Sequence, residues 1–96
     1  MHWVLMYDLA DDYLERRPPL RGDHLSLATA ARDRGDLFIA GALADPADMA
    51  LLVFTNAEAA EQFAQNDPYV RDGLVTRWRV REWTTVIGQG IDPPKP

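Results

Sequence analysis

The chain has 96 residues, of which 47% are hydrophobic and 26% charged, and this fits one small globular domain and excludes a disordered or fibrous protein. Its formal net charge of −5 argues against nucleic acid as a partner, and no apolar run approaches the length of a membrane span. The lack of cysteine excludes disulfides and thiolate metal sites, and without a basic leader segment the expected location is cytoplasmic.

The first half of the chain predicts a strand, a helix and a second strand. Residues 2–9 are rich in β-forming side chains and end in the polar "ADD", as a strand leading into a loop does. A helix is expected to begin near Pro18, because proline is tolerated in the first helical turn, and Gly35 is well placed to end it. Residues 37–43 predict the second strand, in which Gly41 suggests a bulge or a close backbone approach.

The second half of the chain predicts a helix between two further strands. Residues 50–54 are apolar without polar alternation, which is typical of a strand buried on both sides. Thr55 or Asn56 can cap a helix that begins at Ala57. Residues 76–86 predict the last strand, with tryptophan and valine on one face and three arginines on the other.

The element order β-α-β-β-α-β indicates the fold class. It is the order of the split βαβ, or ferredoxin-like, arrangement of the α+β class: a four-stranded antiparallel sheet with both helices on one face. We expect this domain to cover residues 1–87, with residues 88–96 as a flexible C-terminal tail. Because the other sheet face would be bare and partly apolar, we expect the protein to form a homodimer through it.

His24 is the first candidate for chemistry, because the helical period places it on the buried side of its helix. Its neighbours at i−4, i+3 and i+4 are all apolar. A single histidine in such a place is often only a core residue whose ring nitrogens are satisfied internally. Arg17 and Arg21 precede it on the same face and could receive an anionic ligand through charge-assisted hydrogen bonds. They could equally be ordinary surface residues near the helix start.

Asp67 is the second candidate. An aspartate before Pro68 is a common way to end a helix and start a turn, and that alone would explain it. Alternatively, its carboxylate binds one ring nitrogen of His24 and leaves the other free to exchange a proton. The predicted topology permits this contact, because both helices lie on the same sheet face. Tyr69 could help the arginines to stabilise an anionic substrate, while Tyr7 is given a core role.

The sequence resembles the YCII-related proteins, small domains of the dimeric α/β barrel group, in the stretches "RPPLRGDHL", "IAGAL", "AEAAEQFAQNDPYVRDGL" and "RVREW". The specific elements are R-x-x-x-R-x-x-H-L and D-P-Y, and the resemblance extends from the first strand to Trp83. It implies that His24 and Asp67 correspond to the proposed catalytic pair of the family. A few relatives act on ring compounds, in dehydrochlorination or lactone isomerisation.

Three functions remain open at this point. The first is a small enzyme without a cofactor or metal, in which His24 and Asp67 transfer a proton on a small cyclic or anionic substrate, as an isomerase or lyase does. The second is a dimeric module that binds a small acidic ligand without turnover, or an accessory domain. The third is a purely structural dimer in which His24 is bonded internally.

Overall fold

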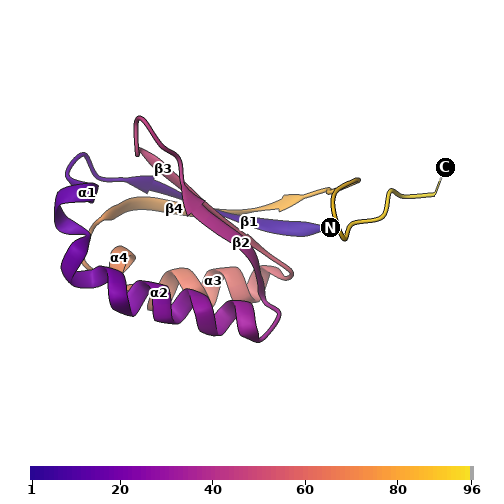
Figure 1. The fold of residues 1–96 in the computed structure, drawn as a ribbon, viewed down its shortest axis with the longest axis horizontal. Coiled ribbons are helices and arrows are strands. Elements are labelled where there is room, and N and C mark those ends of the chain that lie inside the picture. Colours follow the sequence, from indigo (N-terminus) through magenta and orange to yellow (C-terminus); the bar gives the residue numbers. More distant parts are fainter. Residues whose placement is uncertain (96) are drawn as a thin grey trace.

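The computed structural model describes residues 1–95. Its strands are β1 (His2–Leu9), β2 (Leu37–Ala42), β3 (Met49–Phe54) and β4 (Val75–Trp83). Its helices are α1 (Tyr13–Arg16), α2 (Pro18–Asp33), α3 (Ala57–Asn66) and α4 (Pro68–Arg71). The strands form one antiparallel sheet of order β2-β3-β1-β4, and the two long helices lie on the same side of it (Figure 1). The chain thus has the predicted ferredoxin-like α+β fold.

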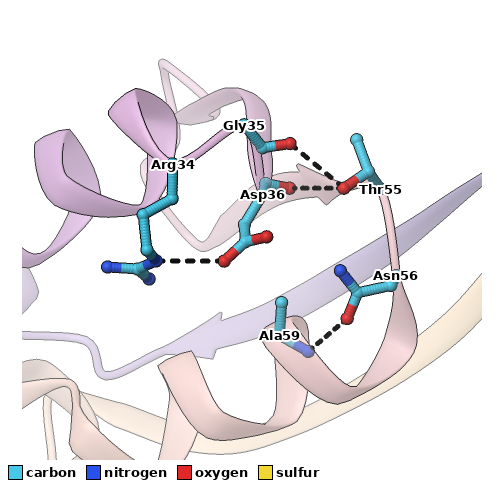
Figure 2. Close-up of polar contacts among 6 residues, drawn as sticks. All are labelled: Arg34, Gly35, Asp36, Thr55, Asn56 and Ala59. Atoms are coloured by element: carbon cyan, nitrogen blue, oxygen red, sulfur yellow. Dashed lines mark hydrogen bonds and ion pairs between the residues drawn. The ribbon is translucent and has the colours of Figure 1, made fainter.

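Local sequence signals explain the ends of the two long helices. Proline occupies the first two positions of α2, and Gly35 follows the helix with a φ of 84°, a backbone conformation that glycine adopts without strain. Asn56 caps α3 by accepting a hydrogen bond of 2.8 Å from the backbone N–H of Ala59. The Thr55 hydroxyl lies within hydrogen-bonding distance of the Gly35 and Asp36 carbonyl oxygens, which ties the end of α2 to the end of β3 (Figure 2).

The core lies between the sheet and the helices. β1 is a central strand, and its side chains at positions 5, 7 and 9 are buried on the helix side. Leu5 is aligned with Leu52 of β3 and Val80 of β4, so one apolar row crosses the middle of the sheet. Phe54 and Phe63 close the core at 5.5 Å between ring centroids, with Phe63 supplied by α3. This packing holds α3 against β3.

Three sequence expectations need correction. The one-turn helix α1 was not predicted, since the two prolines after it indicate only where α2 begins. The register of β2 shifts between Leu37 and Ile39 and not at Gly41, where an added Cβ would meet no atom within 4 Å. β4 ends at Trp83, three residues earlier than expected. Within the predicted tail, two residues form an isolated antiparallel bridge, and residue 96 lies outside the described residues; the tail's flexibility stays a prediction.

Candidate active site

A cavity of about 330 Å³ lies between α2, the edge strand β2 and the sheet. Its wall from β2 and β3 is apolar, whereas its polar side chains come from β1, α1, α2 with its N-cap residue, and α4. The titratable side chains that line it are three tyrosines, three arginines and one histidine: Tyr7, Tyr13, Tyr69, Arg17, Arg21, Arg32 and His24. Among the described residues, no carboxylate lines this cavity, although the chain as a whole is acidic. The cavity therefore suits an anionic ligand with an apolar body.

His24 reaches the cavity from the second turn of α2. Its Nδ1 lies 2.8 Å from Oδ1 of Asp67, and its side chain keeps 16% exposure. An ionised carboxylate only accepts hydrogen bonds, so opposite ionised Asp67 the donor of this bond is Nδ1, and in a neutral imidazole the lone pair is then on Nε2. Within the described residues Nε2 makes no hydrogen bond, and it is the ring nitrogen left for a ligand.

Asp67 is completely buried at the junction of α3 and α4. Pro68 holds Asp67 in an extended conformation, with a ψ of 122°, so the chain turns there and the carboxylate points into the core. Oδ1 also accepts a hydrogen bond of 3.0 Å from the Tyr69 N–H, which caps α4. Asp67 is thus both a turn residue and the partner of His24, and the two interpretations of its role are compatible.

Tyr7 supplies the third donor to this carboxylate. Its hydroxyl donates a hydrogen bond of 2.7 Å to Oδ2 of Asp67 from the middle of β1, 60 residues away in the chain. Burial, followed by the nearby Asp67 charge, raises the pKa of Tyr7 far above its ordinary value. The phenol therefore stays protonated and acts as a hydrogen-bond donor.

The His24 ring is held between aromatic side chains. It stacks on Tyr69 with 3.9 Å between ring centroids and an interplanar angle of 7°, and Phe63 meets it edge-on at 6.1 Å. Tyr13 packs against Tyr69 in an edge-to-face arrangement at 5.7 Å. These contacts, together with the bond to Asp67, fix the ring plane and aim Nε2 in one direction.

The cationic side of the cavity begins at the junction of α1 and α2. The Arg17 guanidinium lies 5.5 Å from the centre of the Tyr13 ring, a cation–π contact. Its Nε is buried and, among the described residues, has no hydrogen-bond partner. Arg21 lies one turn further along α2 and is exposed. An unpaired buried donor, with a second arginine one helical turn away, can donate a hydrogen bond to an anionic oxygen.

Tyr69 stands between these charges and the His24–Asp67 pair. Burial, with smaller contributions from Tyr13 and Asp67, raises the pKa of Tyr69 to about 12 against the opposing effect of Arg21 and Arg17. Its phenol is therefore neutral at physiological pH. A neutral phenol next to two arginines can donate a hydrogen bond to an anionic ligand.

The structure brings together the five side chains that the sequence singled out. His24 and Asp67 form the predicted hydrogen bond, and Arg17, Arg21 and Tyr69 line the same cavity.

Sequence reasoning missed the partnership of Tyr7 with Asp67, and it gave no role to Tyr13 or Arg32. Tyr7 lies on the face that the period-2 pattern assigns to the core, and that assignment is correct. The destination of its hydroxyl depends on a contact across 60 residues, for which the chain carries no local signal. Arg32, two helical turns beyond His24, also lines the cavity and pairs with Asp33 at the surface.

No helix in residues 1–95 is long and apolar enough to cross a membrane. In the same residues, no group of three or more histidine, aspartate or glutamate side chains is arranged to hold a metal ion.

The family model of the YCII-related domain matches residues 1–84. A solved structure of 5-chloro-2-hydroxyhydroquinone dehydrochlorinase from Burkholderia phenoliruptrix AC1100, in complex with 2,5-dihydroxybenzoquinone, is similar, with a TM-score of 0.71 and 20% sequence identity. That likeness covers 96% of this chain and 100% of the other, and at this identity it shows the fold alone. No curated protein matches the chain. Because the family match runs from β1 through the end of β4, the protein belongs to the YCII-related domain family.

Proposed function

We propose that this protein is a YCII-type enzyme in which His24 and Asp67 move a proton on a small cyclic, anionic substrate, without a resident cofactor. The reaction class is an isomerisation or an elimination, and the substrate binds in the cavity beside α2. The observation that carries the proposal is the 2.8 Å bond between His24 Nδ1 and a fully buried carboxylate, made at the wall of an arginine-lined cavity.

The geometry supports a role for His24 as the base. The Asp67 carboxylate stabilises the imidazolium that forms when Nε2 takes a proton, and it holds the ring in the tautomer whose lone pair is on Nε2. The stacked Tyr69 ring and the edge of Phe63 restrict rotation, so little ordering is needed when a substrate binds. A histidine that only filled space would need neither arrangement.

The cationic side of the cavity supports an anionic substrate. In the proposed complex, Arg17, Arg21 and the neutral Tyr69 phenol bind the oxygen that becomes negatively charged. The apolar wall formed by β2 and β3 then contacts the ring of the substrate. A cavity of about 330 Å³ is at the lower end of the range for small-molecule sites, which suits a compound of one or two rings.

The proton step balances without a further reagent. Nε2 of His24 removes a proton from a carbon next to a carbonyl, and the C–H electron pair forms an enolate whose oxygen faces the arginines. In an isomerisation, the imidazolium returns the proton to another carbon of the same system. In an elimination, the enolate electrons expel an anionic leaving group, such as chloride, from a neighbouring carbon, and the imidazolium loses its proton to water.

The family and the fold neighbour support this choice of chemistry. The similar solved structure is that of a dehydrochlorinase, and it holds dihydroxybenzoquinone, a planar ring with acidic oxygens. A ligand of that kind would match the division of the present cavity into an apolar wall and an arginine side.

The proposal is tested by replacing His24 with Ala and Asp67 with Asn and assaying both variants and the wild type on cyclic enols, lactones and halogenated phenols. We expect the wild type to convert at least one compound of this panel and both variants to lose that activity. Equal activity in the wild type and both variants would reject the proposed roles.

The second candidate function is ligand binding without turnover, by this domain alone or as an accessory subunit. It is favoured by the buried, unpaired Nε of Arg17, which a bound anion would satisfy with no chemistry at all. In that case, a halogenated phenol or lactone would raise the melting temperature of the wild type and not of His24→Ala, and no product would form.

We also propose that the working form is a homodimer joined through the sheet face opposite the helices. Val4, Met6, Leu51 and Val53 alternate with the core residues of β1 and β3 and therefore point to that face, which no helix of the described chain covers (Figure 1). Val53 is already buried within one chain, whereas Val4, Met6 and Leu51 are only partly buried, and a second copy would cover them. Analytical ultracentrifugation at micromolar concentration should give twice the mass of one chain, and a monomer there contradicts the proposal.

A further inference from the structure

We propose that Tyr7 is a positioning residue of this site: its buried hydroxyl restrains the Asp67 carboxylate that binds His24 and sets the pH at which His24 takes up its proton. The inference deepens the proposed function and rests on it for its catalytic meaning. Its physical content, the coupling between Tyr7 and His24 through Asp67, can be measured in the protein without any substrate.

The two carboxylate oxygens of Asp67 have different hydrogen-bond partners. Capping of α4 uses only Oδ1, which accepts the Tyr69 N–H and also the proton of His24 Nδ1. Among the described residues, Oδ2 has Tyr7 as its one hydrogen-bond partner, at 2.7 Å. The Tyr7 bond is therefore not required to cap the helix. It restrains the rotation of the carboxylate about its bond to Cβ from the Oδ2 side, while the Tyr69 N–H keeps Oδ1 directed toward His24 when the Tyr7 hydroxyl is removed.

The position of Tyr7 in the sheet makes this arrangement rigid. β1 is hydrogen-bonded on both sides, to β3 and β4, and Tyr7 is 1% exposed. Its neighbours on the same face of β1, Leu5 and Leu9, are apolar, so a phenylalanine would satisfy the packing at position 7 without a hydroxyl. The hydroxyl is thus the feature that needs an explanation, and its contact with Asp67 supplies one.

The electrostatic consequence has a definite sign. A neutral donor on Oδ2 draws negative charge away from the carboxylate, so the carboxylate attracts the His24 imidazolium less strongly than a bare one would. Loss of the donor should make His24 take up its proton at higher pH. The other charged or titratable groups that line the cavity with His24 and Tyr7 are Arg17 at the N-cap of α2, Arg21 and Arg32 from α2, Tyr13 from α1 and Tyr69 from α4. The residues of β2 that line the cavity are apolar, and α3 meets the His24 ring with Phe63.

The experiment follows the titration of His24 by NMR of its ring nitrogens in the full chain without ligand. Tyr7→Phe should move the midpoint of this titration upward by roughly one pH unit, because a charge-assisted hydrogen bond is lost. Tyr13→Phe is the matched control, since it removes a hydroxyl from the same cavity that makes no hydrogen bond to Asp67, and its midpoint should not move. His2, which is bonded to Thr85 outside the site, serves as an internal reference in every spectrum.

A second substitution keeps the test decisive if Tyr7→Phe does not fold. A fluorinated tyrosine introduced at position 7 is a stronger hydrogen-bond donor of nearly the same size, and it should move the His24 midpoint downward. An unchanged midpoint in every folded variant overturns the inference while leaving the proposed function intact. Conversely, shifted midpoints in a protein that converts no substrate would support the coupling and remove its catalytic meaning.

Discussion

The two histidines of this chain are held by similar hydrogen bonds in very different surroundings. His24 Nδ1 lies 2.8 Å from a carboxylate that is completely buried, whereas His2 Nδ1 lies 2.8 Å from the Thr85 hydroxyl, a neutral group. The His24 ring is stacked parallel to the Tyr69 ring, while the His2 ring is tilted against the Phe38 ring at an interplanar angle of 54°. Partner charge, and not residue type or bond length, separates a candidate base from an ordinary polar contact.

The cavities beside the two histidines also differ in the charge of their lining. Three arginines line the one next to His24, and they would attract an anion. A smaller cavity of about 240 Å³ lies next to His2, and most of its lining comes from apolar side chains such as Phe38, Trp83 and Ile87. Both regions are hollow, but only the first combines a base, its buried partner and cationic groups.

The largest difference between the two histidines is expected when each is replaced by alanine. We expect His24→Ala to lower kcat by roughly 10²- to 10⁴-fold, the usual contribution of a general base. His2→Ala should keep the wild-type rate, because His2 does not line the cavity beside His24. Steady-state kinetics on the substrate found in the panel gives both numbers. A loss of activity in His2→Ala as large as that in His24→Ala would show that the difference in partners has no catalytic consequence.

The next prediction concerns stability and compares two aspartates. Asp67→Ala leaves the Tyr7 hydroxyl, the Tyr69 N–H and the His24 ring without an acceptor, so we expect it to lower the free energy of unfolding by about 3 kcal/mol.

Asp8→Ala is the control for this change. It removes a partly exposed ion pair with Arg79, at 3.3 Å, and should cost at most about 1 kcal/mol. Urea denaturation of both variants measures the difference. Equal losses would mean that the buried carboxylate is no better bonded than the surface one.

The third prediction tests the cationic side of the cavity. Arg17→Gln should weaken binding of a halogenated phenolate roughly tenfold, because a charge-assisted hydrogen bond from a partly buried group is lost. Arg16→Gln, its neighbour, is the matched control, since the Arg16 guanidinium is turned toward Asp12 and the Asp72 carbonyl. Isothermal titration calorimetry measures both affinities. If the two substitutions weaken binding to the same extent, long-range charge and not a direct contact attracts the ligand.

Much of the fold could be predicted from the sequence because its signals are local. Proline at the start of α2, Gly35 after it and Asn56 before α3 each act within one turn, and each lies where its pattern indicates. The position of His24 on the inner side of α2 follows from the helical period. These features need no knowledge of distant parts of the chain.

The remaining part of the site depends on distant parts of the chain meeting in space. The acceptor of the Tyr7 hydroxyl is 60 residues away, and the hydrogen bond between His24 and Asp67 spans 43 residues. For the second contact, the predicted topology and the family resemblance supplied the missing information. For Tyr7 neither did, since a tyrosine and a phenylalanine fit a buried strand position equally well.

The fourth prediction is a loss of stability at high pH. Burial raises the pKa of Tyr69 to about 12, and burial together with Asp67 raises that of Tyr7 further. Because the unfolded chain ionises its tyrosines near pH 10, both phenols stabilise the folded state fully below that pH, and the contribution of Tyr69 is lost between pH 10 and about 12. Urea denaturation across this range should show a falling free energy of unfolding. The fall should be shallower in Tyr69→Phe, and an equal slope in both proteins would contradict the assignment.

The smallest effect is expected at the partner of the other histidine. Thr85→Val removes the hydroxyl that bonds His2 and replaces it with a methyl group of similar size, at a site that is only partly buried. The free energy of unfolding should fall by no more than about 1 kcal/mol, since water can take the place of the hydroxyl, and kcat should not change. Urea denaturation and the kinetic assay measure the two quantities on one preparation. A large effect on kcat would connect the cavity beside His2 to the chemistry at His24. The assignment of His2 to a merely structural contact would then be wrong.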